Sequence, residues 1–127
     1  MRVIIVKDKK EMGVRAARLV AEDMGKKTGP YVLGLATGST PLTCYQEWVR
    51  MHKQDSLDFS TVITFNLDEY VGLPPEHDQS YRYFMNQHLF NQKPFKATYV
   101  PNGQAEDLAA ECAHYEEIIA ANPIDIQ

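Results

Sequence analysis

Residues 31–41 read YVLGLATGSTP, and this stretch decides the fold that the sequence predicts. Residues 31–36 form a continuous apolar run, which is typical of a strand buried on both faces. The segment from Thr37 to Pro41 reads as a turn that opens into a helix, with Thr40 as the cap and Pro41 at the first helical position. A buried strand that continues through a turn into a helix is the repeating unit of α/β proteins.

Further strands and helices alternate on either side of this stretch. Apolar and β-branched runs predict strands over residues 2–6, 61–66 and 98–100, and amphipathic periods predict helices over residues 9–25, 42–52, 81–91 and 105–121. This order implies right-handed crossovers between parallel strands, with helices on both faces of the sheet. The sequence therefore predicts an α/β fold with three layers, α/β/α, around a Rossmann-like, mainly parallel sheet.

The predicted helices carry start signals and apolar seams. Asp8 and Ser80 are expected to cap the first and third helices through their side chains. The last helix is expected to pack through a seam at helical spacing, formed by Leu108, Cys112, Tyr115 and Ile119.

The sequence ends on an apolar, strand-like tetrapeptide, Ile124 to Gln127. The sheet is therefore expected to continue, so that the fold is truncated before its C-terminal strands and the chain is the N-terminal part of a longer protein. Residues 1–127 have the length of one domain and are expected to form a single α/β domain. Because a parallel sheet must be paired and covered, this part alone is expected to be unstable or to need a partner chain.

Composition excludes several classes of protein. A hydrophobic share of 44% and a charged share of 24% are ordinary globular values, and a net charge of −4 argues against nucleic-acid binding. No stretch approaches the ~18 apolar residues of a membrane span and no signal-peptide core is present, so a cytoplasmic location and no membrane partner are expected. Cys44 and Cys112 are too few for a disulfide framework or a zinc site and are expected to be small core residues.

The turn after the strand at 31–36 is a candidate phosphate site. Thr37, Ser39 and Thr40 can donate hydroxyl protons to phosphate oxygens, and Gly38 lets the backbone approach closely. The free N–H groups and the dipole of a helix N-terminus favour an anion there. The turn lacks the lysine of the nucleotide-triphosphate loop and the three glycines of the dinucleotide fingerprint. An ordinary capped turn without a ligand is the alternative that spacing leaves open.

A pair of carboxylates follows the predicted strand at 61–66. Asp68 and Glu69 lie where α/β enzymes keep acids and bases, and a partly desolvated Asp there could take a proton from a sugar carbon. If the strand continues through Asp68 and Glu69, the two side chains point in different directions, so at most one of them faces a given pocket. The alternative is a solvated loop acid that caps a helix or pairs with Arg82. The four histidines are scattered, so neither a metal site nor a Ser/His/Asp arrangement is predicted.

Four segments, in this order and spacing, resemble the N-terminal half of the glucosamine-6-phosphate deaminase family over essentially the whole chain. They are GLATGSTP at 34–41, FNLDEYVGL at 65–73, Ser80-Tyr81 with Phe84-Met85, and PNG at 101–103. The part NLDEYVGL is the specific one, whereas each shorter piece would be weak alone.

The resemblance implies an enzyme that converts D-glucosamine 6-phosphate and water into D-fructose 6-phosphate and ammonia, in N-acetylglucosamine catabolism. It implies no organic cofactor and no required metal. Asp68 matches the family's base, which moves a proton from C2 to C1 of the sugar through an enolamine. Thr37, Gly38, Ser39 and Thr40 match the loop that holds the substrate phosphate. The family usually assembles as an oligomer, so the expected partners are a phosphosugar and further copies of the full-length protein.

One part of the family pattern is missing. The second motif, which opens the sugar ring, would begin just beyond Gln127, so residues 1–127 alone are expected to be inactive. Two other interpretations stay open. One is a 6-phosphogluconolactonase-like hydrolase on the same fold, which the context from Asp68 to Tyr70 disfavours. The other is a catalytically silent module that binds a phosphosugar.

Overall fold

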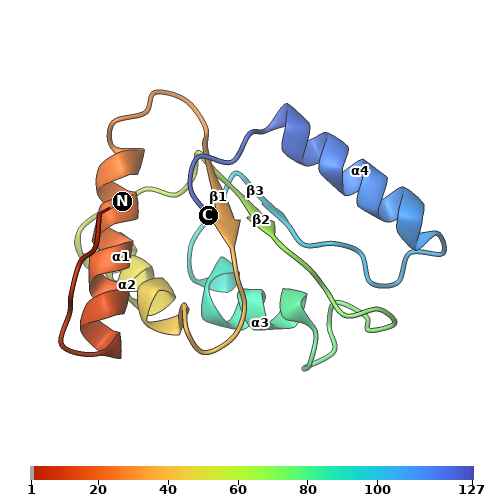
Figure 1. The fold of residues 1–127 in the computed structure, drawn as a ribbon, viewed down its shortest axis with the longest axis horizontal. Coiled ribbons are helices and arrows are strands. Elements are labelled where there is room, and N and C mark those ends of the chain that lie inside the picture. The colour runs from red at the N-terminus through yellow and green to blue at the C-terminus, as the bar shows by residue number, and fades with distance from the viewer. Residues whose placement is uncertain (1) are drawn as a thin grey trace.

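The structure, a computed structural model, describes residues 2–127. Its helices are α1 (Lys9–Met24), α2 (Leu42–Gln54), α3 (Tyr81–His88), the short 3-10 helix η1 (Phe90–Gln92) and α4 (Leu108–Ala121). Its strands are β1 (Tyr31–Leu35), β2 (Val62–Asn66) and β3 (Ala97–Tyr99). The three strands form one parallel sheet in the order β1-β2-β3, which confirms the predicted strand–helix alternation (Figure 1).

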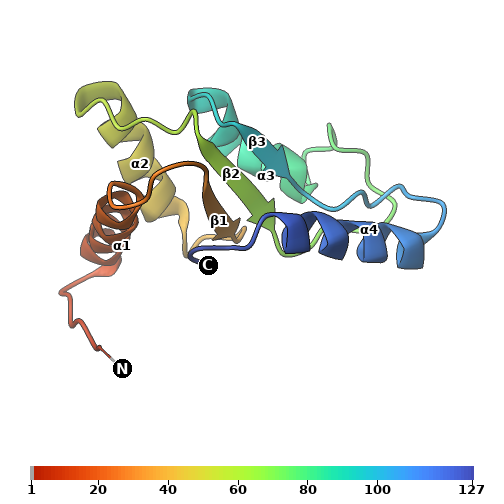
Figure 2. The same ribbon diagram turned by 90° about the horizontal axis from the view of Figure 1, so that it is seen from above.

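The strands divide their side chains between two helical layers. Leu33 and the other odd-numbered residues of β1 pack with α1, α2 and α3, together with Val62 of β2. Val32, Ile63 and Phe65 face the opposite side and pack against α4. Successive strand residues point to opposite faces, so continuous apolar runs place a core on each side. The predicted α/β/α arrangement is therefore confirmed, with α4 alone on its face of the sheet (Figure 2).

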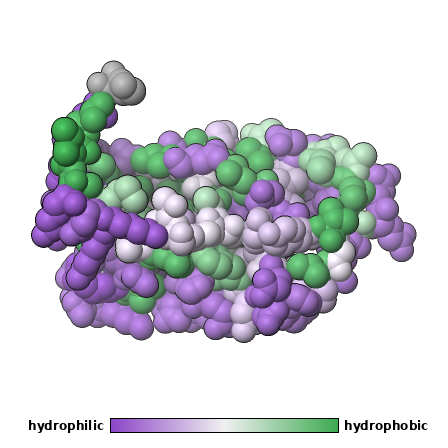
Figure 3. All heavy atoms as spheres, turned by 60° about the horizontal axis from the view of Figure 1, so that its bottom comes forward, coloured by the Kyte–Doolittle hydropathy of each residue, from purple (hydrophilic) through white to green (hydrophobic). Residues whose placement is uncertain are grey.

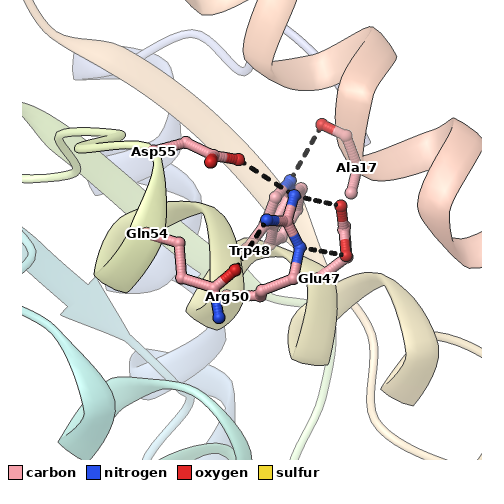
Figure 4. Close-up of polar contacts among 6 residues, drawn as sticks. All are labelled: Ala17, Glu47, Trp48, Arg50, Gln54 and Asp55. Carbon is pink, nitrogen blue, oxygen red and sulfur yellow. Dashed lines mark hydrogen bonds and ion pairs between the residues drawn. The ribbon is translucent and has the colours of Figure 1, made fainter.

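Helices α1 and α2 are joined through the indole of Trp48, which is 3% exposed. Its Nε1 donates to the carbonyl oxygen of Ala17 in α1 at 3.1 Å, as Figure 4 shows. On the outer side of α2, Arg50 binds Glu47 at 2.7 Å and Asp55 at 2.9 Å. Burial of one large aromatic side chain contributes roughly 1.5–3 kcal/mol, so Trp48 contributes more to this contact than the half-exposed ion pairs do.

The predicted capping residues of α1 and α3 are confirmed, and the predicted cap of α2 is not. Asp8 accepts from the backbone N–H of Glu11 at 2.8 Å, and Ser80 accepts from that of Tyr83 at 3.0 Å. The prediction that Thr40 caps α2 is wrong. Pro41 already has helical backbone angles, stands at the cap position itself and leaves the exposed Thr40 outside the helix.

The strand predicted over residues 2–6 is also wrong. This segment forms no strand, and Val3 and Ile5 are 72% and 93% exposed. Its apolar side chains protrude from the rest of the molecule in Figure 3. No strand among residues 2–127 pairs with it, and an apolar run without a pairing partner cannot satisfy its backbone groups inside a core.

The C-terminal residues run beside the free edge of β1. Gly34 donates its N–H to Ile126 O at 2.8 Å, Asp125 donates to Val32 O at 2.9 Å, and Leu33 forms a parallel bridge with Ile126. These contacts are those of a parallel neighbour of β1, but they amount to one isolated bridge, so a further strand here stays a prediction.

The seam predicted for α4 is half right. Tyr115 and Ile119 pack against the sheet, whereas Leu108 is 42% exposed and Cys112 is also exposed. The N-terminal turns of α4 extend past the strands (Figure 1), and Leu108 and Cys112 belong to these turns. Cys112 is therefore no core residue, while Cys44 packs partly buried against the core.

Candidate functional site

The two segments singled out from the sequence lie at the same end of the sheet. Residues 37–40 follow β1, and Asp68 and Glu69 follow β2. Because β1 and β2 are parallel and paired in register from Tyr31 to Leu35, their carboxyl ends are adjacent. In open α/β sheets this is the position at which ligands bind.

A side chain of α2 fixes the residue that precedes the loop at residues 37–40. The hydroxyl of Tyr45 accepts from Ala36 N at 3.2 Å and donates to Ala36 O at 2.5 Å. Burial, which is the largest cause, raises the pKa of Tyr45 well above its ordinary value, so the hydroxyl keeps its proton. A second contact at the same place is made by Asn66, whose amide donates to Leu35 O at 3.4 Å. These side chains fix the point from which the loop leaves the strand.

The loop itself offers free donors. Gly38 has a φ of 91°, a backbone conformation that favours glycine. No backbone N–H of residues 37–40 donates to another group within residues 2–127. Gly38, Ser39 and Thr40 are exposed and Thr37 is partly buried. The arrangement suits a bound anion at the start of α2.

A pocket of about 330 Å³ lies between this loop and the start of α3. Residues from three segments line it: Thr37, Gly38, Tyr70, Asp78, Gln79, Ser80, Tyr81 and Phe84. Of the four residues predicted for phosphate, Thr37 and Gly38 therefore line this pocket and Ser39 does not. Thr40 lines a different, larger apolar groove of about 760 Å³ between α1, β1 and α2.

The two carboxylates after β2 have different surroundings, although β2 ends at Asn66 and strand alternation does not extend to them. Asp68 is exposed, and its carboxylate has no hydrogen-bond partner among residues 2–127. Glu69 accepts from the backbone N–H groups of Tyr81 and Arg82 at the start of α3, at 2.8 and 2.9 Å. The capping role left open for this pair therefore falls to Glu69.

Sequence reasoning missed Tyr81 as a pocket residue. The Tyr70 hydroxyl is the main cause that raises the pKa of Tyr81, followed by burial, the Tyr70 charge and the charge of Asp68, while Thr37 lowers it. Tyr81 lines the pocket together with Thr37 and Tyr70. The aromatic rings of Tyr70 and Tyr81 lie 4.7 Å apart. The signal that could have found Tyr81 is its place directly after the capping residue Ser80.

No histidine takes part in this arrangement. His52 contacts Leu57 O, and His77 accepts from Gln79 N within its own turn. Within residues 2–127 no group of three or more His, Cys, Asp or Glu side chains could hold a metal ion. No helix in this part of the chain is long and apolar enough to span a membrane.

The family can be assigned by comparison with known proteins. The family model described as glucosamine-6-phosphate isomerases/6-phosphogluconolactonase matches residues 7–126. The chain belongs to this family. Relatives named glucosamine-6-phosphate deaminase are 56% identical over 127 residues in Pediococcus pentosaceus and 54% identical over 127 residues in Enterococcus faecalis. Each match covers the whole of this chain but only 51% and 52% of the relative, so the chain spans about half the length of these curated proteins.

Two solved structures share the fold. A monomeric glucosamine-6-phosphate deaminase superposes with a TM-score of 0.90 at 36% identity, over 98% of this chain and 52% of that protein. A 6-phosphogluconolactonase from Shewanella baltica superposes with a TM-score of 0.72 at 17% identity, over 95% of this chain and 53% of that one. The first likeness accompanies substantial sequence identity, whereas the second concerns the fold alone.

Proposed function

We propose that this chain is the N-terminal half of a glucosamine-6-phosphate deaminase, which converts D-glucosamine 6-phosphate and water into D-fructose 6-phosphate and ammonia. The observation that carries the proposal is the juxtaposition of the anion-binding loop at residues 37–40 with the free carboxylate of Asp68, across the ends of two adjacent parallel strands. The deaminase names of the similar proteins from P. pentosaceus and E. faecalis support it.

The proposed roles follow from this arrangement. Thr37, Gly38, Ser39 and Thr40 hold the substrate phosphate through backbone N–H and hydroxyl groups. Asp68, exposed and without a protein partner, takes the proton from C2 of the opened sugar, which leaves an enolamine. It then delivers the proton to C1. Hydrolysis of the resulting imine releases ammonia. Ring opening needs groups that residues 1–127 do not supply.

Several wider features stay predictions. Residues 1–127 are proposed to belong to a single α/β domain that is inactive on its own. The full-length protein is proposed to be a homo-oligomer of amino-sugar catabolism in the cytoplasm, acting on a phosphosugar without a cofactor.

The test uses this chain followed by the C-terminal half of the P. pentosaceus relative, joined after Gln127 and called here the completed chain. Ammonia release from glucosamine 6-phosphate is expected, together with exchange of the C2 hydrogen with solvent deuterium. Asp68→Asn should lower turnover by about 100-fold or more, because an amide keeps the shape but cannot accept the proton. The exposed acid Glu76 of the same loop gives the control, Glu76→Gln, which should keep parental turnover.

Other results would redirect the assignment. Hydrolysis of 6-phosphogluconolactone in place of ammonia release would favour the second activity that the family description covers. Phosphosugar binding without either reaction would favour a binding module. Parental C2 exchange in Asp68→Asn would show that another group is the base.

A further inference from the structure

The carboxylate of Glu69 accepts three hydrogen bonds, all from backbone N–H groups. Its Oε1 accepts from Tyr70 and Tyr81, both at 2.8 Å, and its Oε2 accepts from Arg82 at 2.9 Å. Tyr81 and Arg82 open α3, where the first N–H groups have no partner within the helix. One side chain therefore joins the loop after β2 to the start of α3, and its charge lies at the positive end of the helix dipole.

The opposite side of the same loop packs against the turn before α4. Gly72 donates its N–H to Gly103 O at 2.7 Å. A Cβ at Gly103 would overlap the carbonyl oxygen of Tyr70, so no residue with a side chain fits this contact unchanged. The loop from Asp68 to Gly72 is thus held between α3 on one side and the turn at 101–103 on the other.

These contacts restrain the backbone that carries Asp68. Asp68 and Glu69 are joined by one peptide bond, so a Glu69 fixed to the start of α3 limits where the backbone of Asp68 can lie. The same carboxylate fixes the backbone of Tyr81, whose side chain lines the pocket together with Thr37. Glu69 itself does not line that pocket. It can therefore influence a ligand there only through its neighbours.

We propose that Glu69 is a positioning residue, whose carboxylate holds Asp68 and Tyr81 at a fixed place opposite the phosphate loop at residues 37–40. The inference rests on the proposed function, because it assigns to Glu69 the alignment of Asp68 with C2 of the phosphosugar. A proton transfer from carbon requires the base within hydrogen-bond reach of the proton, and a misplacement of about 1 Å can reduce the rate about 100-fold.

The test compares Glu69→Gln with the parent in the completed chain, by steady-state kinetics of ammonia release. The amide retains one acceptor oxygen and turns an NH2 group toward a backbone donor, so at least one of the three hydrogen bonds is lost. We expect kcat to fall on the order of 10- to 100-fold. KM should stay within about twofold, because the phosphate loop is held by Tyr45 and Asn66 and not by Glu69. Glu76→Gln is the matched control.

A double variant separates positioning from a general structural effect. If Glu69 acts through Asp68, then Glu69→Gln in an Asp68→Asn background should change kcat by less than about twofold, because residues that act as a unit are non-additive. Gly103→Ala displaces the same loop from its other side and should show the same loss and the same non-additivity. It also serves as the second probe should Glu69→Gln not fold.

Each outcome decides the question. Parental kcat in Glu69→Gln, or a loss that multiplies with that of Asp68→Asn, overturns the positioning role. A rise in KM that accounts for the whole loss assigns Glu69 to substrate binding and also overturns it. A completed chain that binds phosphosugar but releases no ammonia contradicts the proposed function, and the inference falls with it.

Discussion

Lys93 is expected to destabilise the fold at neutral pH, and its replacement by methionine should stabilise it. The side chain is 5% exposed, and its Nζ has no hydrogen-bond partner. The ammonium lies 3.5 Å from the centre of the Phe59 ring, with the Trp48 and Phe95 rings at 5.7 and 5.5 Å. Burial lowers the pKa of Lys93 from 10.5 to about 7, with the charge of Cys44 acting weakly in the opposite direction.

The sign of the effect follows from proton binding. Between about pH 7 and pH 10.5 the unfolded chain binds more protons at Lys93 than the folded chain does. The free energy of unfolding therefore rises with pH across this window, by at most about 1.4 kcal/mol per pH unit and about 5 kcal/mol in total. The aromatic rings attract the charged form and offset about 1–2 kcal/mol of the burial penalty. Lys93→Met should therefore raise the free energy of unfolding at pH 7 by about 2–3 kcal/mol.

Urea unfolding of the completed chain at pH 7, 8 and 9 measures this difference. The gap between parent and Lys93→Met should shrink as pH rises, since titrating groups that do not interact with Lys93 cancel in the comparison. Lys96→Met, at an exposed lysine three residues away, should show no such gap. A destabilised Lys93→Met, or a gap that is constant with pH, would refute the argument that a buried ammonium is the cause.

Two further predictions concern the phosphate loop and the uncovered groove. Tyr45→Phe removes both contacts of the hydroxyl with Ala36 and should raise KM for the phosphosugar about tenfold with little change in kcat. Steady-state kinetics of the completed chain measure both constants. A fall in kcat with an unchanged KM would contradict this prediction. Residues 1–127 alone expose an apolar groove of about 760 Å³ and should aggregate, or melt cooperatively only after the separately produced C-terminal half of the relative is added. If residues 1–127 alone are monomeric in sedimentation and melt cooperatively in calorimetry, the prediction of instability is contradicted.

The strands and helices of the fold could be predicted where each carried its own local signal. The apolar run at 31–36 and the capping residues Asp8 and Ser80 act within a few positions of the chain, and the structure places β1, α1 and α3 accordingly. The apolar run at 2–6 has the same local appearance yet forms no strand. Whether such a run becomes a strand depends on a hydrogen-bonding partner elsewhere, which local pattern does not reveal.

The face of α4 shows the same limit at the level of packing. Helical spacing correctly grouped Leu108, Cys112, Tyr115 and Ile119 on one side of the helix. Only the second pair lies over the sheet, because three-residue β3 ends before the first turns of α4 are covered. The period of a helix predicts which residues share a face, but the length of the layer beneath decides which of them are buried.

In the candidate site, too, one part depends on local sequence and another part on tertiary contacts. The phosphate loop is shaped within one strand–turn–helix unit, where Tyr45 reaches back nine residues to Ala36, so a local sequence pattern suffices to predict it. The loop that carries Asp68 is held by Glu69, which reaches Tyr81 twelve residues ahead. It is held also by the distant turn at 101–103, which a pattern around Asp68 cannot contain. If Asp68 is the base, as proposed, its alignment is a property of tertiary contacts, and substitutions well outside the loop after β2 are expected to reduce kcat without changing KM.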